Sequence, residues 1–154
     1  MPDAPVILLA EDREDDILLI QKAFAKSTFP YVLCVVRNGE EVLAYLQGEP
    51  PYDDRARFPL PALLLLDLKM PRMDGFEVLE WIRQHPSFFA LRVVVLTSSQ
   101  IASDTNRAYE AGANSFLVKP SDFQNYVELT EFINGFWLQF NSRLQGTGLA
   151  HLNN

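Results

Sequence analysis

The amino-acid sequence predicts an open α/β fold, in which helices cover both faces of a parallel β-sheet. Short runs of wholly apolar residues, of which residues 6–10 are the first, lack the alternation of a half-exposed strand and are typical of strands buried on both faces. Segments with helical spacing of apolar residues separate these runs, so strands and helices alternate five times. We expect strands at residues 6–10, 31–36, 62–66, 93–96 and 116–118.

The expected helices begin and end at residues with clear local preferences. The acids before residue 17 favour a helix start, because the N-terminal end of a helix attracts negative charge. Asp74 and Asp122 are placed to cap helix N-termini, and Gly48 and Gly112 are placed to end helices. We expect helices at residues 17–25, 40–46, 75–85, 101–111 and 123 to about 140, and a long proline-rich loop at 48–61.

Length, charge and cysteine content exclude several classes of protein. The 154 residues suit one domain, and the net charge of −7 makes nucleic acid and anionic membrane surfaces poor partners. A single cysteine, Cys34, excludes an internal disulfide framework and fits a reducing compartment. The chain has no signal-peptide pattern and no apolar run near the roughly 20 residues of a membrane span. We expect a cytoplasmic protein with one domain at 1–140, a tail at 141–154 and no output domain.

Polar residues directly follow four of the apolar runs. They are Glu11 and Asp12, then Asp67, Thr97 and Lys119. Because the carboxyl ends of parallel strands meet at one edge of a sheet, we expect these side chains to lie together. Three crowded carboxylates need a counter-charge, and a set of oxygen ligands favours Mg²⁺ over zinc. A metal, a lysine and a free carboxylate together indicate phosphoryl transfer to a carboxylate.

Four motifs in this order resemble the receiver domain of bacterial two-component response regulators. The motifs are Glu11-Asp12, the segment DLKMPRMDG at 67–75, the segment LTS at 96–98 and the segment FLVKP at 116–120. The separations of 30 residues from Asp67 to Thr97 and 22 from Thr97 to Lys119 also fit that family. The resemblance covers residues 6–140 and implies a flavodoxin-like (βα)5 receiver fold with strand order 2-1-3-4-5.

The resemblance implies a role for each residue that reacts or moves. Asp67 is expected to be the phosphoacceptor, and Lys119 to pair with the phosphoryl oxygens. Thr97 and Phe116 are expected to form a switch, in which Thr97 turns toward the phosphoryl group and Phe116 rotates inward behind it. The bond from Lys119 to Pro120 is expected to be cis, which is uncommon even before proline.

The resemblance also implies a metal and a partner. Mg²⁺ or Mn²⁺ is expected on Asp12, Asp67 and the backbone carbonyl of Lys69, with Glu11 acting through water. Such a protein takes its phosphoryl group from a sensor histidine kinase and acts on a downstream effector or phosphotransfer protein. It assists its own phosphorylation and dephosphorylation but is not otherwise an enzyme.

Two features are similar to stand-alone regulators that pair with phytochrome-type histidine kinases. They are the loop at 48–61 and the late aromatic group at 136–138. Two positions depart from the commoner family pattern, since Glu11 stands in place of Asp and Phe116 in place of Tyr. Phe116 cannot make the hydroxyl hydrogen bond of a tyrosine switch.

The last helix carries more apolar residues than one core-facing stripe requires. We therefore expect a second apolar face that packs against another copy of the chain, in a homodimer with a two-fold axis. The candidate dimer face consists of Phe132, Phe136, Trp137 and Phe140.

Two other functions compete with a phosphorylation switch. A Mg²⁺-dependent phosphohydrolase with an aspartate nucleophile needs an acid two residues after that nucleophile, and this chain has Lys69 there. A degenerate receiver could act only as a dimerisation or docking scaffold, but it would have no reason to keep the costly carboxylates. The sequence favours a switch that controls partner binding or takes part in a phosphorelay.

Overall fold

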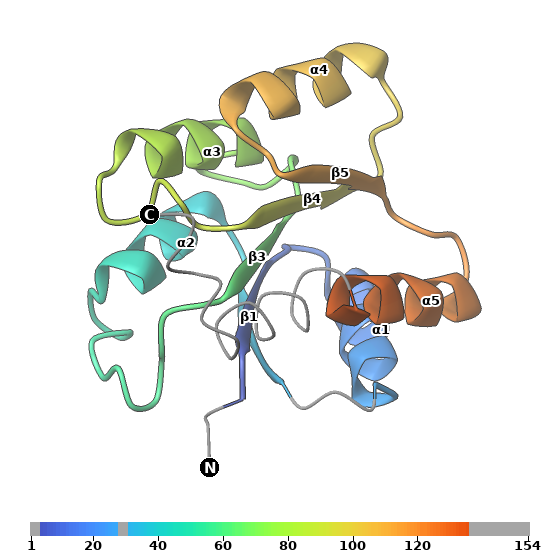
Figure 1. Cartoon of the computed structure of the whole chain (residues 1–154), viewed down its shortest axis with the longest axis horizontal. Coiled ribbons are helices and arrows are strands. Elements are labelled where there is room, and N and C mark those ends of the chain that lie inside the picture. The colour runs from blue at the N-terminus through green and yellow to red at the C-terminus, as the bar shows by residue number, and fades with distance from the viewer. Residues whose placement is uncertain (1–3, 28–30, 136–154) are drawn as a thin grey trace, which may run out of the picture.

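In the computed structural model, which describes residues 4–27 and 31–135, five strands form one parallel sheet (Figure 1). The order β2-β1-β3-β4-β5 confirms the predicted doubly wound arrangement, with β1 and β3 at the centre. The strands are β1 (Val6–Ala10), β2 (Val32–Val36), β3 (Leu63–Leu66), β4 (Val93–Thr97) and β5 (Ser115–Val118).

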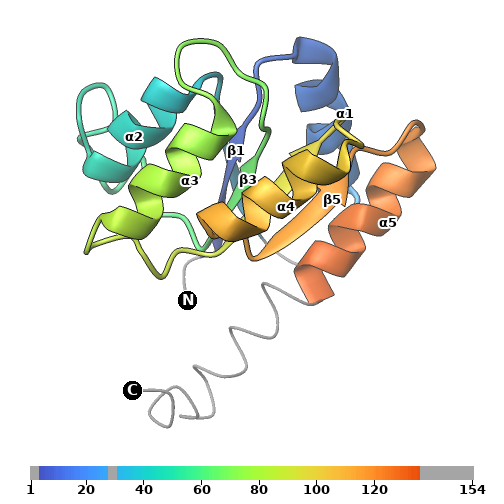
Figure 2. The ribbon, with the colours of Figure 1, turned by 90° about the horizontal axis from the view of Figure 1, so that it is seen from above.

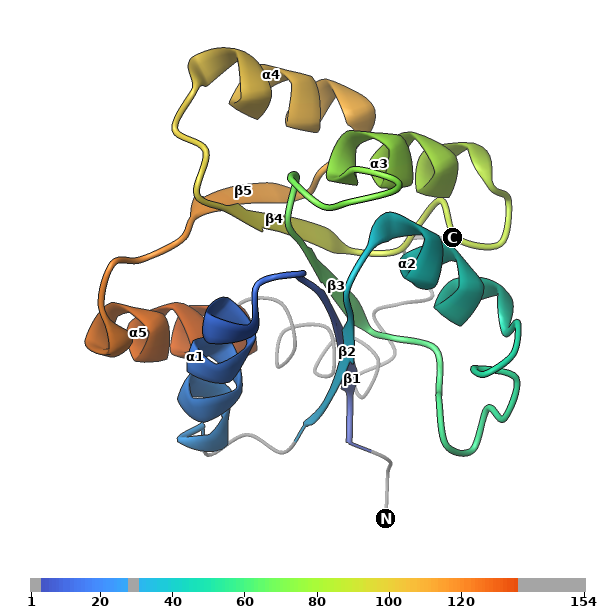
Figure 3. The ribbon, with the colours of Figure 1, turned by 180° about the vertical axis from the view of Figure 1, so that it is seen from behind.

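Helices cover both faces of the sheet (Figures 2 and 3). On one face α1 packs against α5, and on the other α3 lies between α2 and α4. The helices are α1 (Glu14–Ala25), α2 (Gly39–Gln47), α3 (Gly75–Gln84), α4 (Ala102–Ala111) and α5 (Phe123–Ile133). None of these described helices is long and apolar enough to cross a membrane.

Two hydrophobic cores lie on the two faces of the sheet, because successive side chains of a strand point in opposite directions. In β1, Leu8 joins the core under α2 and α3, whereas Ile7 and Leu9 join the core under α1 and α5. In the central strands the side chains that point to either face of the sheet are fully buried. This explains why the sequence of these strands is apolar at every position.

Helix boundaries differ from the predicted ones most clearly in α1. The sequence pattern places its start near residue 17, but the helix begins at Glu14, so three acids occupy its first turn. Negative charge there is favourable to the helix dipole. The early start brings Asp16 onto the helix, where its side chain faces the end of the sheet.

The predicted caps at Asp74 and Asp122 are confirmed. The side chain of Asp74 accepts a hydrogen bond from the backbone N–H of Glu77, and the Glu77 side chain accepts one in return, which makes a full capping box. The side chain of Asp122 accepts from the backbone N–H of Asn125. The predicted extension of this helix to about residue 140 lies outside the described residues.

The proline-rich loop at 48–61 is an ordered segment fastened to the end of α2. The guanidinium group of Arg55 donates to the carbonyl oxygens of Tyr45, Leu46 and Phe58 at 2.7–3.1 Å. It therefore supplies donors in the last turn of α2, where carbonyl groups lack helical partners, although the carbonyl of Tyr45 also accepts from the backbone N–H of Gly48. The rings of Tyr45, Tyr52 and Phe58 pack together beneath it, with centroids 5.2–6.0 Å apart.

The start of α3 presses against the end of β3 at Gly75. A Cβ atom at this position would lie 2.5 Å from the backbone oxygen of Asp67 and 2.8 Å from the Cα of Leu68. The backbone N–H of Gly75 also donates to the carbonyl of Leu68 at 2.9 Å. The absent side chain thus lets α3 hold the segment that carries Asp67.

We expect Gly75→Ala to lower the free energy of unfolding by about 2 kcal/mol, because backbone atoms would have to move to admit the methyl group. Urea unfolding followed by circular dichroism measures this change. Gly135→Ala is the matched control, since a Cβ there would meet nothing within 4 Å. Equal stability of the two variants would contradict the role given to Gly75.

Candidate functional site

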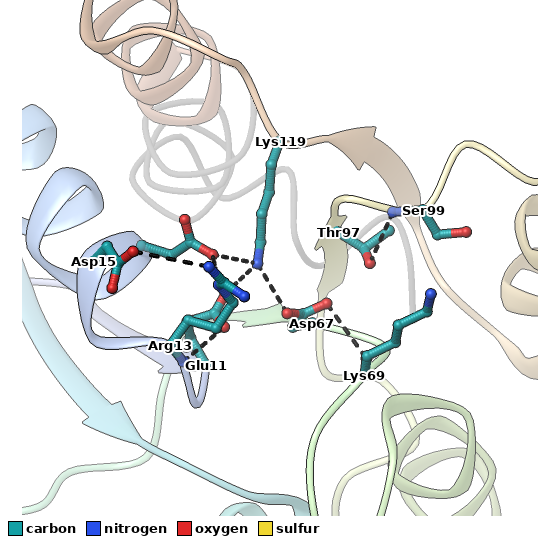
Figure 4. Close-up of polar contacts among 9 residues, drawn as sticks. Glu11, Arg13, Asp15, Asp67, Lys69, Thr97, Ser99 and Lys119 are labelled. Atoms are coloured by element: carbon teal, nitrogen blue, oxygen red, sulfur yellow. Dashed lines mark hydrogen bonds and ion pairs between the residues drawn. The ribbon is translucent and has the colours of Figure 1, made fainter.

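The carboxyl ends of the strands bring Glu11, Asp67, Thr97 and Lys119 together at one edge of the sheet (Figure 4). Glu11 follows β1, Asp67 follows β3, Thr97 ends β4 and Lys119 follows β5. The Nζ atom of Lys119 lies 2.5 Å from Oε1 of Glu11 and 2.9 Å from Oδ2 of Asp67. The ammonium group therefore joins the ends of three strands.

Burial makes this charge cluster unusual. Glu11 is 1% exposed, Asp67 is 4% exposed and the side chain of Lys119 is 6% exposed. A buried charge is costly unless it is paired and hydrogen-bonded. Each carboxylate here depends on Lys119, and Glu11 gains a second bond because its Oε2 accepts from the backbone N–H of Arg13 at 3.1 Å.

The pKa values of Glu11 and Lys119 reflect these surroundings. Burial raises the pKa of Glu11 to about 7, although the hydrogen bond from Lys119 lowers it and the charge of Asp67 raises it. Burial by itself would lower the pKa of Lys119, but the hydrogen bonds to its carboxylate partners outweigh burial and raise that pKa above its ordinary value. The lysine is therefore a permanent positive charge.

Three carboxylates at this edge form a group able to hold a metal ion. One oxygen from each of Glu11, Asp12 and Asp67 lies within 4.8 Å of the others. Asp12 is exposed, so an ion would reach it from solvent. Oxygen ligands with room for several waters fit Mg²⁺ or Mn²⁺. The backbone carbonyl of Lys69 as a ligand, and water between Glu11 and the metal, stay predictions.

Asp16 is a member of the cluster that the sequence reasoning missed. Its Oδ2 accepts a hydrogen bond from Nζ of Lys119 at 2.9 Å, and Nε of Arg13 lies 3.5 Å from the same oxygen. Asp16 lies in the first turn of α1, four residues after Asp12, which precedes the helix. The sequence pattern marks this run of acids only as a helix start and gives no separate signal for Asp16.

Thr97 and Phe116 lie on adjacent strands beside this cluster. Thr97 is fully buried, and its Oγ1 accepts from the backbone N–H of Ser99 at 3.4 Å. Phe116 is half-buried, and its backbone N–H donates to the hydroxyl of Tyr109 at 3.1 Å. A tyrosine hydroxyl thus bonds β5, but it comes from α4 and not from position 116.

The expected cis bond before Pro120 is wrong. Within the described residues the cis peptide bond joins Pro50 and Pro51, and the bond from Lys119 to Pro120 is trans. Trans is the lower-energy form of the bond before proline. With this geometry the backbone N–H of Lys119 donates to the carbonyl of Thr97 at 2.8 Å, while its side chain reaches the carboxylates.

The predicted dimer face falls mostly outside the described residues. Phe132 lies on α5 and is 51% exposed. Phe136, Trp137 and Phe140 lie beyond residue 135. The homodimer therefore stays a prediction.

Residues 7–131 match the family model of the response regulator receiver domain. This match spans most of the chain, so the protein belongs to the response regulator receiver family. The fold agrees with that membership. So does the order of the residues at the strand ends, which are an acid, the candidate phosphoacceptor, a hydroxyl and a lysine.

Three relatives carry the resemblance further. The response regulator Rcp1 of Synechocystis is 37% identical over 134 residues, which cover 87% of this chain and 89% of Rcp1. The structure of its Mn²⁺-bound form aligns with a TM-score of 0.78. The phosphorylated cyanobacterial phytochrome response regulator RcpA is 37% identical, with a TM-score of 0.81 over 88% of this chain and 95% of that one. RPA3017, a response regulator in red light signaling of R. palustris, is 38% identical. Its structure aligns with a TM-score of 0.82 over 87% of this chain and 94% of that one.

We expect Mg²⁺ to stabilise the protein, because the ion supplies the counter-charge that the carboxylates lack. At a free concentration about a hundred times Kd, binding would add about 2.7 kcal/mol to the free energy of unfolding. Thermal unfolding with Mg²⁺ and with a chelator measures this gain.

Asp12→Asn should lose most of the gain in stability with Mg²⁺. Asp15→Asn is the control, because that exposed side chain carries the same charge three residues further along the chain but contacts Arg13 at 3.8 Å. An equal loss in both variants would show a general charge effect and not a site at Asp12.

Proposed function

We propose that this receiver is a phosphorylation switch in which Asp67 accepts a phosphoryl group from the phosphohistidine of a sensor kinase. The observation that carries the proposal is the position of Asp67. Its carboxylate lies 2.9 Å from the ammonium group of Lys119, and one of its oxygens lies within 4.8 Å of oxygens of Glu11 and Asp12. A nucleophilic carboxylate between a cation and a metal site is the arrangement that phosphoryl transfer requires.

The transfer is a substitution at phosphorus. An oxygen of Asp67 attacks the phosphorus atom, an O–P bond forms, and the P–N bond to the donor imidazole breaks with its electron pair left on nitrogen. Lys119 neutralises charge on the phosphoryl oxygens. When it is bound by Asp12 and Asp67, Mg²⁺ supplies further positive charge at the same oxygens. Attack by water on the phosphorus atom breaks the O–P bond, which restores the Asp67 carboxylate and releases inorganic phosphate.

Phosphorylation would then shift an equilibrium between two conformations. The hydroxyl of Thr97 is the donor next along the sheet edge from Asp67, and Phe116 on β5 pairs with Val95, two residues before Thr97. If Thr97 turns toward the phosphoryl group, the buried space that it leaves favours an inward turn of Phe116. The contact between Phe116 and Tyr109 carries such a change to α4. The surface of α4 and β5 is therefore where we place the docking of a downstream partner.

A phytochrome-type histidine kinase is the partner class that we propose as the phosphodonor. The support is the similarity to RcpA and RPA3017, which their descriptions connect with phytochrome and with red light signaling. The similarity extends over almost the full length of those chains. Transfer from a phytochrome-type kinase should therefore be faster than transfer from a kinase of an unrelated class.

Intact-mass measurement with Mg²⁺ and a small phosphodonor tests the chemistry. We expect one added phosphoryl group on the wild type, none on Asp67→Asn, and none in the presence of a chelator, because the nucleophile and its counter-charge are both required. Asp53→Asn, which changes an exposed acid in the loop at 48–61, should be modified like the wild type.

Two results would contradict the proposal. An adduct that persists on Asp67→Asn would place the reaction at another residue. A wild type that takes up no phosphoryl group, either from small donors or from kinases, would leave the scaffold role as the function of the fold.

A further inference from the structure

Lys119 has all three of its N–H donors committed in the described structure. The ammonium group contacts Glu11 from the end of β1, Asp67 from the end of β3 and Asp16 from α1. A lysine has no fourth donor. An oxygen brought to Asp67 on a phosphoryl group can therefore bind Lys119 only in exchange for one of these partners.

Of the two partners that keep a full negative charge when Asp67 carries a phosphoryl group, Asp16 is the one that Lys119 can release at the lower cost. Glu11 is 1% exposed, and a carboxylate buried to that extent is strongly destabilised when it loses its counter-charge. The side chain of Asp16 is 19% exposed, so water can replace part of the lost bond. Nε of Arg13 already lies 3.5 Å from Oδ2 of Asp16 and provides a second positive charge.

We infer that Asp16 is a positioning residue that holds Lys119 against α1 and competes with the incoming phosphoryl group for its ammonium. The inference rests on the proposed function and adds a residue to it. Asp16 neither attacks phosphorus nor is required to hold the metal. Its effect passes through Lys119, and it slows phosphorylation because the bond between Asp16 and Lys119 must break on the way to the transition state.

The test is the rate of phosphorylation of Asp67 by a small phosphodonor at saturating Mg²⁺, followed by intact mass. Loss of one partly exposed ion pair corresponds to a rise in the maximal rate constant of about fivefold in Asp16→Asn. The phosphodonor concentration at half-maximal rate should stay the same, since Asp16 acts on the transition state and not on donor binding. Asp16→Ala is the second variant if Asp16→Asn does not fold.

Asp15→Asn is the matched control. It removes one negative charge from the same turn of α1, and its side chain is 79% exposed and contacts Arg13 at 3.8 Å. Its maximal rate should equal that of the wild type. An equal increase in both variants would make the effect one of overall charge and would overturn the inference.

A double-mutant cycle with Lys119→Met separates positioning from a merely structural effect. In the Lys119→Met background Asp16→Asn should change the slow residual rate less than about twofold, because the competing ammonium is gone. A fivefold increase that persists without Lys119 would overturn the inference. A wild type that is modified at the same rate as Asp16→Asn would overturn it as well, while leaving the proposed function intact. A wild type that takes up no phosphoryl group would overturn both the inference about Asp16 and the proposed function.

Discussion

The ion pairs that Lys119 makes with carboxylates at the sheet edge are the interaction on which the remaining geometry depends. A single ammonium group faces Glu11, Asp16 and Asp67, and Asp12 lies beside them. Negative charge exceeds positive charge at this edge, so the folded chain carries electrostatic repulsion in a place with little water. The two apolar cores must offset that cost, which is consistent with their complete burial in β1, β3 and β4.

The repulsion explains why the backbone around the site is so tightly held. Asp67 follows a four-residue strand buried on both faces, and the start of α3 presses against the same segment at Gly75. The backbone N–H of Lys69 donates to Oδ1 of Asp67 at 3.4 Å, which orients the carboxylate from the other side. Rigid elements thus hold the carboxylate of Asp67 near Lys119, so ion binding does not have to assemble the site.

Most of the fold was predictable from the sequence because one physical rule covers it. Strands buried on both faces are apolar throughout, and strands joined by helices run parallel, so the residues after each run meet at one edge. This reasoning found Glu11, Asp67 and Lys119 without knowledge of the structure. It did not find Asp16, because the helix start was placed three residues too late and a run of acids has many possible roles.

Other features depend on contacts between residues far apart in sequence. The loop at 48–61 was correctly predicted to be a loop, but its composition does not reveal that Arg55 bonds the carbonyls at the end of α2. The trans bond before Pro120 shows a second feature that could not be predicted from the sequence. That expectation came from family resemblance, and the small energy difference between the two isomers before proline leaves the outcome to local packing.

Lys119 connects the candidate site to both faces of the sheet. On one side Asp16 belongs to α1, which packs against α5. On the other side β5 continues to Phe116, whose backbone bonds Tyr109 on α4. If the proposed exchange takes place, the ammonium group would loosen its contact with α1 while Lys119 stays attached to β5. A partner that binds at α1 or at α4 would then alter how readily Lys119 moves.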